Sequence, residues 1–290
     1  MSNSDAEETK TSIHQKCRFD TDDADVTFQS SDGIQFKLHR KYLEAYTGAF
    51  PGDSARELRS DRPTDVTHLT ESAEILEILF QFVYPRRHPS LEGLAFKDLA
   101  PLAEAVEKYE VYSAMTICQI RLKPFIPEYA LEILVHGIKH DYSELVNEAA
   151  LHLSRNHRPL DQFLIKLPNN AMFPWIRYSE AWGSIFEKAL QLTGVHHNEE
   201  SSATDIPCDR CQTLIVTYIV KLERVSSLST LSARLDAGLP AESAKVIGNC
   251  RRGCPQAKTA TKCMERVIKL CKDGITSMRP FTEFLKETTG

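Results

Sequence analysis

The N-terminal third of the chain first alternates apolar and polar residues and then changes to a helical period. Residues 25–38 hold two alternating runs on either side of Asp32-Gly33. Alternation of this kind around an Asp-Gly turn predicts a β-hairpin. From Arg40 the apolar positions follow a helical period until Pro51-Gly52 interrupts it, and residues 65–69 form a third predicted strand.

The later part of the chain is predicted to be helical. In residues 72–84 the apolar side chains recur at i, i+4, i+7 and i+8, which predicts an amphipathic helix that Pro85 closes. Strand patterns are absent after Pro127. The predicted fold class is an α/β core of short strands flanked by helices, followed by an all-α C-terminal region.

Changes in composition divide the chain into four predicted segments. The first is acidic and poor in apolar residues, so it is expected to be a disordered arm. A polar stretch, HHNEESSATD, separates the two helical segments. In chain order we expect the arm at 1–22, the α/β domain at 24–122, a helical extension at 125–195 and a C-terminal helical block with cysteine pairs at 206–290.

Composition is typical of a soluble globular protein, with 42% hydrophobic and 26% charged residues. No apolar run approaches the ~20 residues that span a bilayer, and the first residues lack the apolar core of a secretory signal. Eight cysteines without such a signal indicate reduced thiols, so we expect an intracellular protein of the nucleus or cytoplasm. The net charge of -5 argues against a general nucleic-acid surface.

Common catalytic and nucleotide-binding motifs are missing from the sequence. It contains no GxSxG, no HExxH, no phosphate-binding glycine loop and no dinucleotide-binding glycines. No nucleophile and base, and no cofactor-binding constellation, can be assembled from what is present. The sequence therefore predicts a protein that is not an enzyme.

Five stretches between residues 24 and 122 together resemble the BTB/POZ domain. They are DVTF from Asp25, FKLHRKYL from Phe36, Ala49-Phe50, VTHL from Val66, and ILEILFQFVY from Ile75. The YPRRHP run from Tyr84 and the helices after it look like fungal members with a BACK-type extension. The resemblance covers about a third of the chain and implies protein–protein interaction, not catalysis.

The resemblance gives a role to three charged positions near the hairpin. In BTB domains the matching Asp and Arg line a charged pocket near the dimer interface, here Asp25 and Arg40, with His39 as a hydrogen-bonding partner. A carboxylate and a guanidinium at adjacent strand ends can pair where neither would be buried alone. The alternative is that all three residues are architectural.

Two departures from the family pattern bear on partners. Long BTB forms exchange an apolar N-terminal helix and strand between protomers, and residues 1–23 lack that apolar stripe. Cullin-binding members carry bulky apolar residues and a Glu after the small-aromatic pair, whereas residues 51–58 here are polar. The resemblance therefore implies a homodimer or a protein partner. Binding to a cullin-type ubiquitin ligase stays possible, but residues 51–58 do not support it.

Two cysteine pairs in the C-terminal block have metal-binding spacing. Cys208 and Cys211 form a CxxC pair, and Cys250 and Cys254 form a CxxxC pair. Four thiolates would make a closed structural Zn²⁺ site, but the two pairs lie far apart in sequence. Two turns with unrelated thiols are the alternative. We expect Cys118, Cys263 and Cys271 to be packed in the interior instead.

Two histidines one helical turn apart, His136 and His140, also have metal-ligand spacing. They lack the Glu of a zinc-peptidase motif and project away from the apolar face of their helix, which predicts a solvated face. The leading hypothesis for the whole chain is a non-enzymatic interaction module, which dimerises or recruits partners in transcription or ubiquitin ligation. One alternative is a zinc-stabilised scaffold. Another is a nucleic-acid-binding regulator that uses Arg251, Arg252, Lys258, Lys262, Arg266, Lys269 and Lys272.

Overall fold

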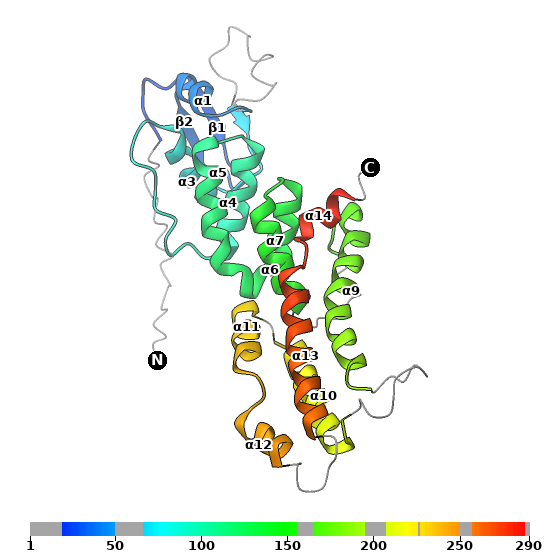
Figure 1. Ribbon diagram of the computed structural model, residues 1–290. Helices are drawn as coiled ribbons and strands as arrows, with labels where there is room; N and C mark the ends of the chain where they lie inside the picture. Colours follow the sequence, from blue (N-terminus) through cyan, green and yellow to red (C-terminus); the bar gives the residue numbers. More distant parts are fainter. Residues whose placement is uncertain are drawn as a thin grey trace, which may run out of the picture. The chain divides into compact units, whose positions relative to one another are not determined.

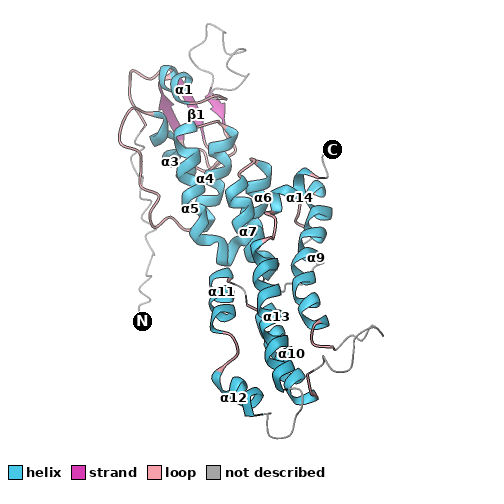
Figure 2. Cartoon of the chain, viewed as in Figure 1, coloured by secondary structure: helices cyan, strands magenta, loops and turns pink. Residues whose placement is uncertain are grey.

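The computed structural model describes six ranges of the chain: 19–49, 66–155, 165–194, 207–225, 227–249 and 257–287. The chain divides into two compact units, unit 1 over Met1–Lys123 and unit 2 over Pro124–Gly290. Strands occur in unit 1, and the described part of unit 2 is helical (Figure 2). The predicted fold class, an α/β core followed by an all-α region, is confirmed.

Unit 1 is built on a small three-stranded sheet. The predicted hairpin is present, with β1 (Val26–Gln29) antiparallel to β2 (Gln35–Leu38). Gly33 in the connecting turn has a φ of 87°, a left-handed conformation that glycine adopts without strain. The predicted third strand is β3 (Val66–His68), which pairs in parallel with β1, so the strand order is β2-β1-β3.

Four helices complete the described part of unit 1 (Figure 1). They are α1 (Arg40–Tyr46), α3 (Ala73–Val83), α4 (Phe96–Lys108) and α5 (Tyr112–Leu122). Phe28 and Phe36 sit opposite each other on β1 and β2, and both are 1% exposed. Their rings lie 6.2 Å and 5.3 Å from that of Phe80 on α3, which forms the centre of the core.

The end of the predicted disordered arm is folded onto the sheet. Phe19 is only 4% exposed, and its ring lies 5.8 Å from that of Phe80. Its carbonyl accepts a hydrogen bond from the backbone N–H of Lys37, while the Lys37 ammonium pairs with Asp20 at 2.7 Å. The expectation of disorder is therefore wrong at residues 19–22, because one aromatic side chain provides enough buried surface to fix the segment. Residues 1–18 lie outside the described residues.

Unit 2 consists of helices joined to unit 1 through a 3-10 turn at Lys123–Phe125. In chain order the helices are α6 (Ile126–Lys139), α7 (Ser143–Arg155), α9 (Asn169–Gln191), α10 (Asp209–Glu223), α11 (Leu228–Ala237), α12 (Ala241–Asn249), α13 (Ala257–Thr276) and α14 (Phe281–Lys286). The long helix α9 contacts α7, α10, α13 and α14. Helices from both predicted helical segments therefore pack in one unit.

A buried arginine joins two of these helices. Arg155 at the end of α7 is 4% exposed and donates hydrogen bonds to the carbonyls of Leu222, Glu223 and Val225 at 2.8–3.0 Å. The carbonyls of Leu222 and Glu223 belong to the last turn of α10, where helical carbonyls lack a partner within the helix, and Val225 follows just beyond the helix. The guanidinium also lies over the ring of Trp182 on α9. One side chain thus connects α7, α9 and α10.

Candidate functional site

The three charged residues that the sequence singled out lie where β2 passes into α1. His39 is the residue between these two elements. Its Nε2 is 3.1 Å from a carboxylate oxygen of Asp23, and its Nδ1 is 3.0 Å from the hydroxyl of Tyr84. The hydrogen bond with His39 holds the pKa of the Asp23 carboxyl below its ordinary value. His39 is therefore positioned by partners on both of its ring nitrogens.

The predicted buried ion pair between Asp25 and Arg40 is wrong. Asp25 is exposed, and its carboxylate accepts a hydrogen bond from the backbone N–H of Arg40 at 2.7 Å. No ion pair joins the two side chains among the residues that the structure describes. Asp25 instead accepts a hydrogen bond from the first N–H group of α1. The N-terminus of a helix favours a negative charge, because its first N–H groups lack partners within the helix.

Asp32 has a comparable function at the other end of the hairpin. Its carboxylate accepts a hydrogen bond from the backbone N–H of Ala73, the first residue of α3, at 2.9 Å. A hydrogen bond with Ser30 holds the pKa of the Asp32 carboxyl below its usual range. The hairpin therefore supplies an acidic residue to the start of two helices, which sets the direction of both relative to the sheet.

Aromatic rings and cations surround His39. The Tyr84 ring lies 4.9 Å from that of Tyr42 and 5.4 Å from that of Phe19. The Arg86 guanidinium lies 5.0 Å from the Phe19 ring. Burial raises the pKa of the Tyr84 hydroxyl. A guanidinium over an aromatic ring is a common stabilising contact within proteins. We call Phe19, His39, Tyr42, Tyr84 and Arg86 the His39 cluster.

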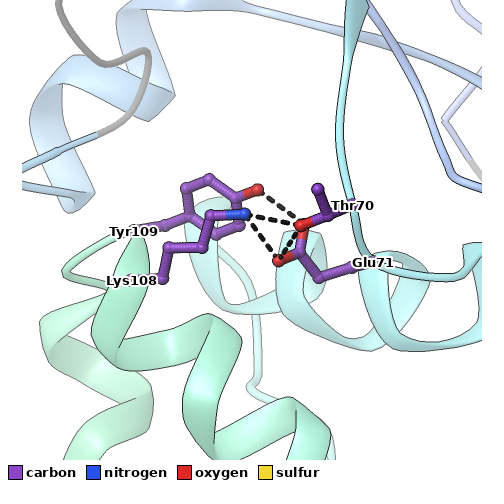
Figure 3. A network of polar contacts seen from close by, with 4 residues as sticks. All are labelled: Thr70, Glu71, Lys108 and Tyr109. Carbon is purple, nitrogen blue, oxygen red and sulfur yellow. Dashed lines mark hydrogen bonds and ion pairs between the residues drawn. The ribbon is translucent and has the colours of Figure 1, made fainter.

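A second polar network, which sequence analysis missed, joins the start of α3 to the end of α4 (Figure 3). The Lys108 ammonium lies 2.8 Å from both the Glu71 carboxylate and the Thr70 hydroxyl. The hydroxyl of Tyr109 donates to Glu71 at 2.6 Å. Burial opposes ionisation of Glu71, but the hydrogen bonds from Lys108 and Tyr109 outweigh it and lower the pKa of that carboxyl. Burial and the neighbouring Glu71 raise the pKa of Tyr109.

Replacing Glu71 by glutamine is expected to lower the free energy of unfolding of unit 1 at neutral pH. We expect a loss of about 1–2 kcal/mol, because the charge-assisted hydrogen bond from Lys108 is lost. The loss stays small because water already screens the half-exposed Lys108 ammonium. The folded-state pKa of Glu71 lies below its ordinary value of 4.5. Its contribution is therefore complete above pH 4.5 and is lost as the pH falls through the folded-state pKa.

Urea denaturation of the wild type and the variant at neutral pH and at about pH 3 measures this effect, since the difference should shrink in acid. The matched control is Glu92→Gln, which removes the exposed pair between Glu92 and Arg121 on the same unit. That control should change the free energy of unfolding by less than about 0.5 kcal/mol. An acid-independent loss for Glu71→Gln would contradict an electrostatic origin.

The predicted metal-binding cysteines are only partly visible. Cys208 precedes α10 and is partly exposed, whereas Cys211 in its first turn is fully buried. Cys250 and Cys254 lie outside the described residues, so the convergence of the two pairs stays a prediction.

The other three cysteines singled out by the sequence are buried, which confirms their predicted packing role: Cys118, Cys263 and Cys271. Burial raises the pKa of Cys118 to about 12 and that of Cys271 to about 11. These thiols are therefore not activated as nucleophiles.

The expectation for the helical histidines needs correction. His136 is 8% exposed, and the centres of the His136 and His140 rings lie 4.7 Å apart. Tyr142 lies beside both rings, at 5.9 Å from His136. The predicted solvated face is wrong at His136, because the turn after α6 places an aromatic side chain against it.

Comparison with known protein families agrees with the architecture of unit 1. Residues 15–125 match the family model of the BTB/POZ domain. A search of curated proteins found no match to the chain. No helix in the described part of the chain is both long enough and apolar enough to span a membrane.

Proposed function

We propose that this chain is a non-enzymatic interaction protein, because residues 15–125 match the family model of the BTB/POZ domain, a module that generally mediates protein–protein interaction. Its BTB/POZ domain binds a second copy or a partner protein, and its helical unit presents a separate surface to a target. The family match is the observation that carries this proposal.

The surface of α5 supports the proposal. Tyr112 and Ile120 are 59% and 58% exposed, although the same helix buries Ala114, Cys118 and Leu122. Tyr112 and Ile120 are eight positions, or about two helical turns, apart, and exposed apolar side chains on one side of a helix are a candidate contact surface for a partner. The exposed sector of α5 is thus suited to bind another protein.

Light scattering of the full chain over a range of concentrations, together with capture of partners, tests this function. We expect a concentration-dependent dimer or a captured partner, and we expect Tyr112→Glu with Ile120→Glu to weaken that association. The matched control is Glu44→Gln, an exposed substitution on α1. The proposal would be contradicted if the chain stayed monomeric and captured no partner whose binding these variants weaken. It would also be contradicted if the chain turned over a small molecule and a single substitution abolished that activity.

The biological setting is also part of the proposal. A role in transcription or as a ubiquitin-ligase adaptor, in the nucleus or cytoplasm, fits a protein that joins two partners. The alternative of a nucleic-acid-binding regulator rests on the basic residues of α13. Such a regulator would bind DNA of arbitrary sequence with an affinity that falls steeply as the salt concentration rises.

A structural zinc ion is a further part of this proposal. Cys208 is the N-cap of α10 and Cys211 lies in its first turn, so the pair has the CxxC spacing of a metal-binding turn. Binding of a metal to the folded state would add to the stability of unit 2. Elemental analysis of the purified chain is expected to find zinc that Cys250→Ser with Cys254→Ser removes. The zinc ion would be excluded if the purified wild-type chain contained no metal and the double variant had the same free energy of unfolding as the wild type.

A further inference from the structure

The helical unit contains a large groove between α9 and α13, which lie alongside each other (Figure 1). The groove has a volume of about 1030 Å³ and extends along α9 from Arg177 to Leu192. Its floor is apolar and includes Ile185, Leu270 and Phe284. The two helices approach closely at Gly274, where an added Cβ would lie 3.0 Å from the Ile185 side chain. Apolar side chains from α9, α13 and α14 therefore contribute to the lining of the groove.

The rim of the groove is mainly basic. Five cations and two carboxylates line it: Arg177, Lys188, Arg266, Lys269 and Arg279, with Glu180 and Asp273. At one end, Arg177 and Arg279 share the carboxylate of Glu287. At the other end, Lys188, Arg266 and Lys269 form no ion pair with another residue in the part of the chain that the structure describes. These three exposed cations favour an acidic occupant.

An exposed aromatic residue lies on α9 one helical turn before the groove begins. Phe173 lies four positions before Arg177 on α9, so the two side chains share a face of the helix. Its side chain is 62% exposed, and neighbouring Ile176 is 39% exposed. Other aromatic residues of α9, such as Trp175 and Tyr178, are buried against α14 instead. Phe173 is therefore available to contact a partner at the end of the groove.

The walls of the groove determine the conformation of its occupant. Both walls are α-helices, whose backbone N–H and C=O groups are already paired within the helix. An extended peptide would find no strand edge to pair with, so the groove favours an amphipathic helix, whose backbone groups are paired internally. The stretch from Arg177 to Leu192 is about 22 Å long at 1.5 Å per residue, which is room for about four helical turns.

From these observations we propose that the groove between α9 and α13 binds an acidic amphipathic helix of a partner protein. The apolar stripe of that helix lies on the floor, and its Asp and Glu side chains meet Lys188, Arg266 and Lys269. Glu180 and Asp273 lie on the same rim, so the acidic residues of the partner are expected to contact the three cations and not these carboxylates. A nucleic acid is the other anionic ligand that the test below includes. This inference goes beyond the proposed function, because it assigns a partner chemistry to the helical unit.

Fluorescence anisotropy with the full chain and a labelled synthetic helix tests the proposal. The probe is a peptide of about 18 residues with Leu at i, i+3, i+4 and i+7 and Glu at the flanking positions. We expect it to bind, more weakly as salt rises. A scrambled peptide of the same composition, a peptide with Lys in place of Glu, and a DNA duplex of arbitrary sequence are the comparison ligands, and all three should bind much more weakly.

Variants of the chain locate the binding surface. Arg266→Glu with Lys269→Glu is expected to weaken binding of the acidic peptide by about tenfold or more and to strengthen binding of the Lys peptide. Phe173→Ala should weaken it by about threefold, because an apolar contact is lost. The matched control is Lys221→Glu, an exposed reversal on α10 that does not line the groove, and it should leave binding unchanged.

Three outcomes would overturn the proposal. Equal binding of the acidic and scrambled peptides would remove the helical requirement, and an unchanged affinity in the double reversal would place the site elsewhere. Tighter binding of the DNA duplex would identify a nucleic-acid surface instead. Self-association through the BTB/POZ domain, measured by light scattering of the same variants, should be unaffected, so failure here is distinguishable from failure of the proposed function.

Discussion

Replacing Arg155 by methionine is expected to lower the free energy of unfolding of unit 2 by about 3–5 kcal/mol, because the carbonyls of Leu222, Glu223 and Val225 lose a charged donor. The Leu222 carbonyl keeps the backbone N–H of Val225, so the loss falls mainly on the other two. Methionine has a similar length and fills much of the space, so the loss reports mainly on hydrogen bonding. The contacts with the Trp182 and Phe186 rings, at 5.4 Å and 4.9 Å, are lost as well. A carbonyl left unpaired in the interior costs more than an average hydrogen bond contributes.

Tryptophan fluorescence during urea denaturation measures this effect. Both tryptophans of the chain, Trp175 and Trp182, belong to α9, so the signal reports on unit 2. Arg155→Lys should recover only part of the loss, since one ammonium cannot reproduce the planar fork of the guanidinium. The matched control is Arg121→Met, which removes an exposed pair with Glu92 and should cost less than about 0.5 kcal/mol. Equal small effects for both arginines would contradict the connecting role.

Replacing Phe80 by alanine is expected to lower the free energy of unfolding of unit 1 by about 3–5 kcal/mol. Phe80 is fully buried, and its ring lies within 6.2 Å of those of Phe19, Phe28 and Phe36. Alanine would leave a cavity among three rings that come from two strands and the N-terminal segment. Because the strands are fixed by their hydrogen bonds, the rings can close only part of that cavity.

Hydrogen exchange of peptides from β1 and β2, together with calorimetry, measures the loss at Phe80. The exposed Phe173 serves as the matched control, since Phe173→Ala removes the same atoms from a side chain that is 62% exposed. That control should change stability by less than about 0.5 kcal/mol. Unchanged exchange in the strands of Phe80→Ala would show that the aromatic cluster does not hold the sheet together.

The amino-acid sequence was sufficient to predict most elements of unit 1. The hairpin, the third strand and α3 depend on periodicity within about ten residues, and such patterns report directly on which face is buried. In the C-terminal block, α10 and α13 follow from their apolar stripes. The short helices α11, α12 and α14 were missed, because segments of six to ten residues hold too few apolar repeats to stand out.

Contacts between distant parts of the chain could not be predicted in the same way. The sequence placed Asp25 near Arg40, but whether its carboxylate would meet the guanidinium or the backbone N–H depended on the direction in which α1 leaves the sheet. Phe19 appeared to be an isolated apolar residue in an acidic arm, and only the assembled sheet provides the surface on which it is buried.

The sequence by itself therefore determined the order of elements, the change from an α/β to an all-α region, and the BTB/POZ character of the first unit. Tertiary structure decided the polar connections between distant residues and the position of the groove in unit 2. Glu71 and Lys108 are 37 positions apart, and Arg155 and Val225 are 70 apart. No local pattern relates such residues, because their distance in space is set by the packing of whole helices, which also creates the groove between α9 and α13.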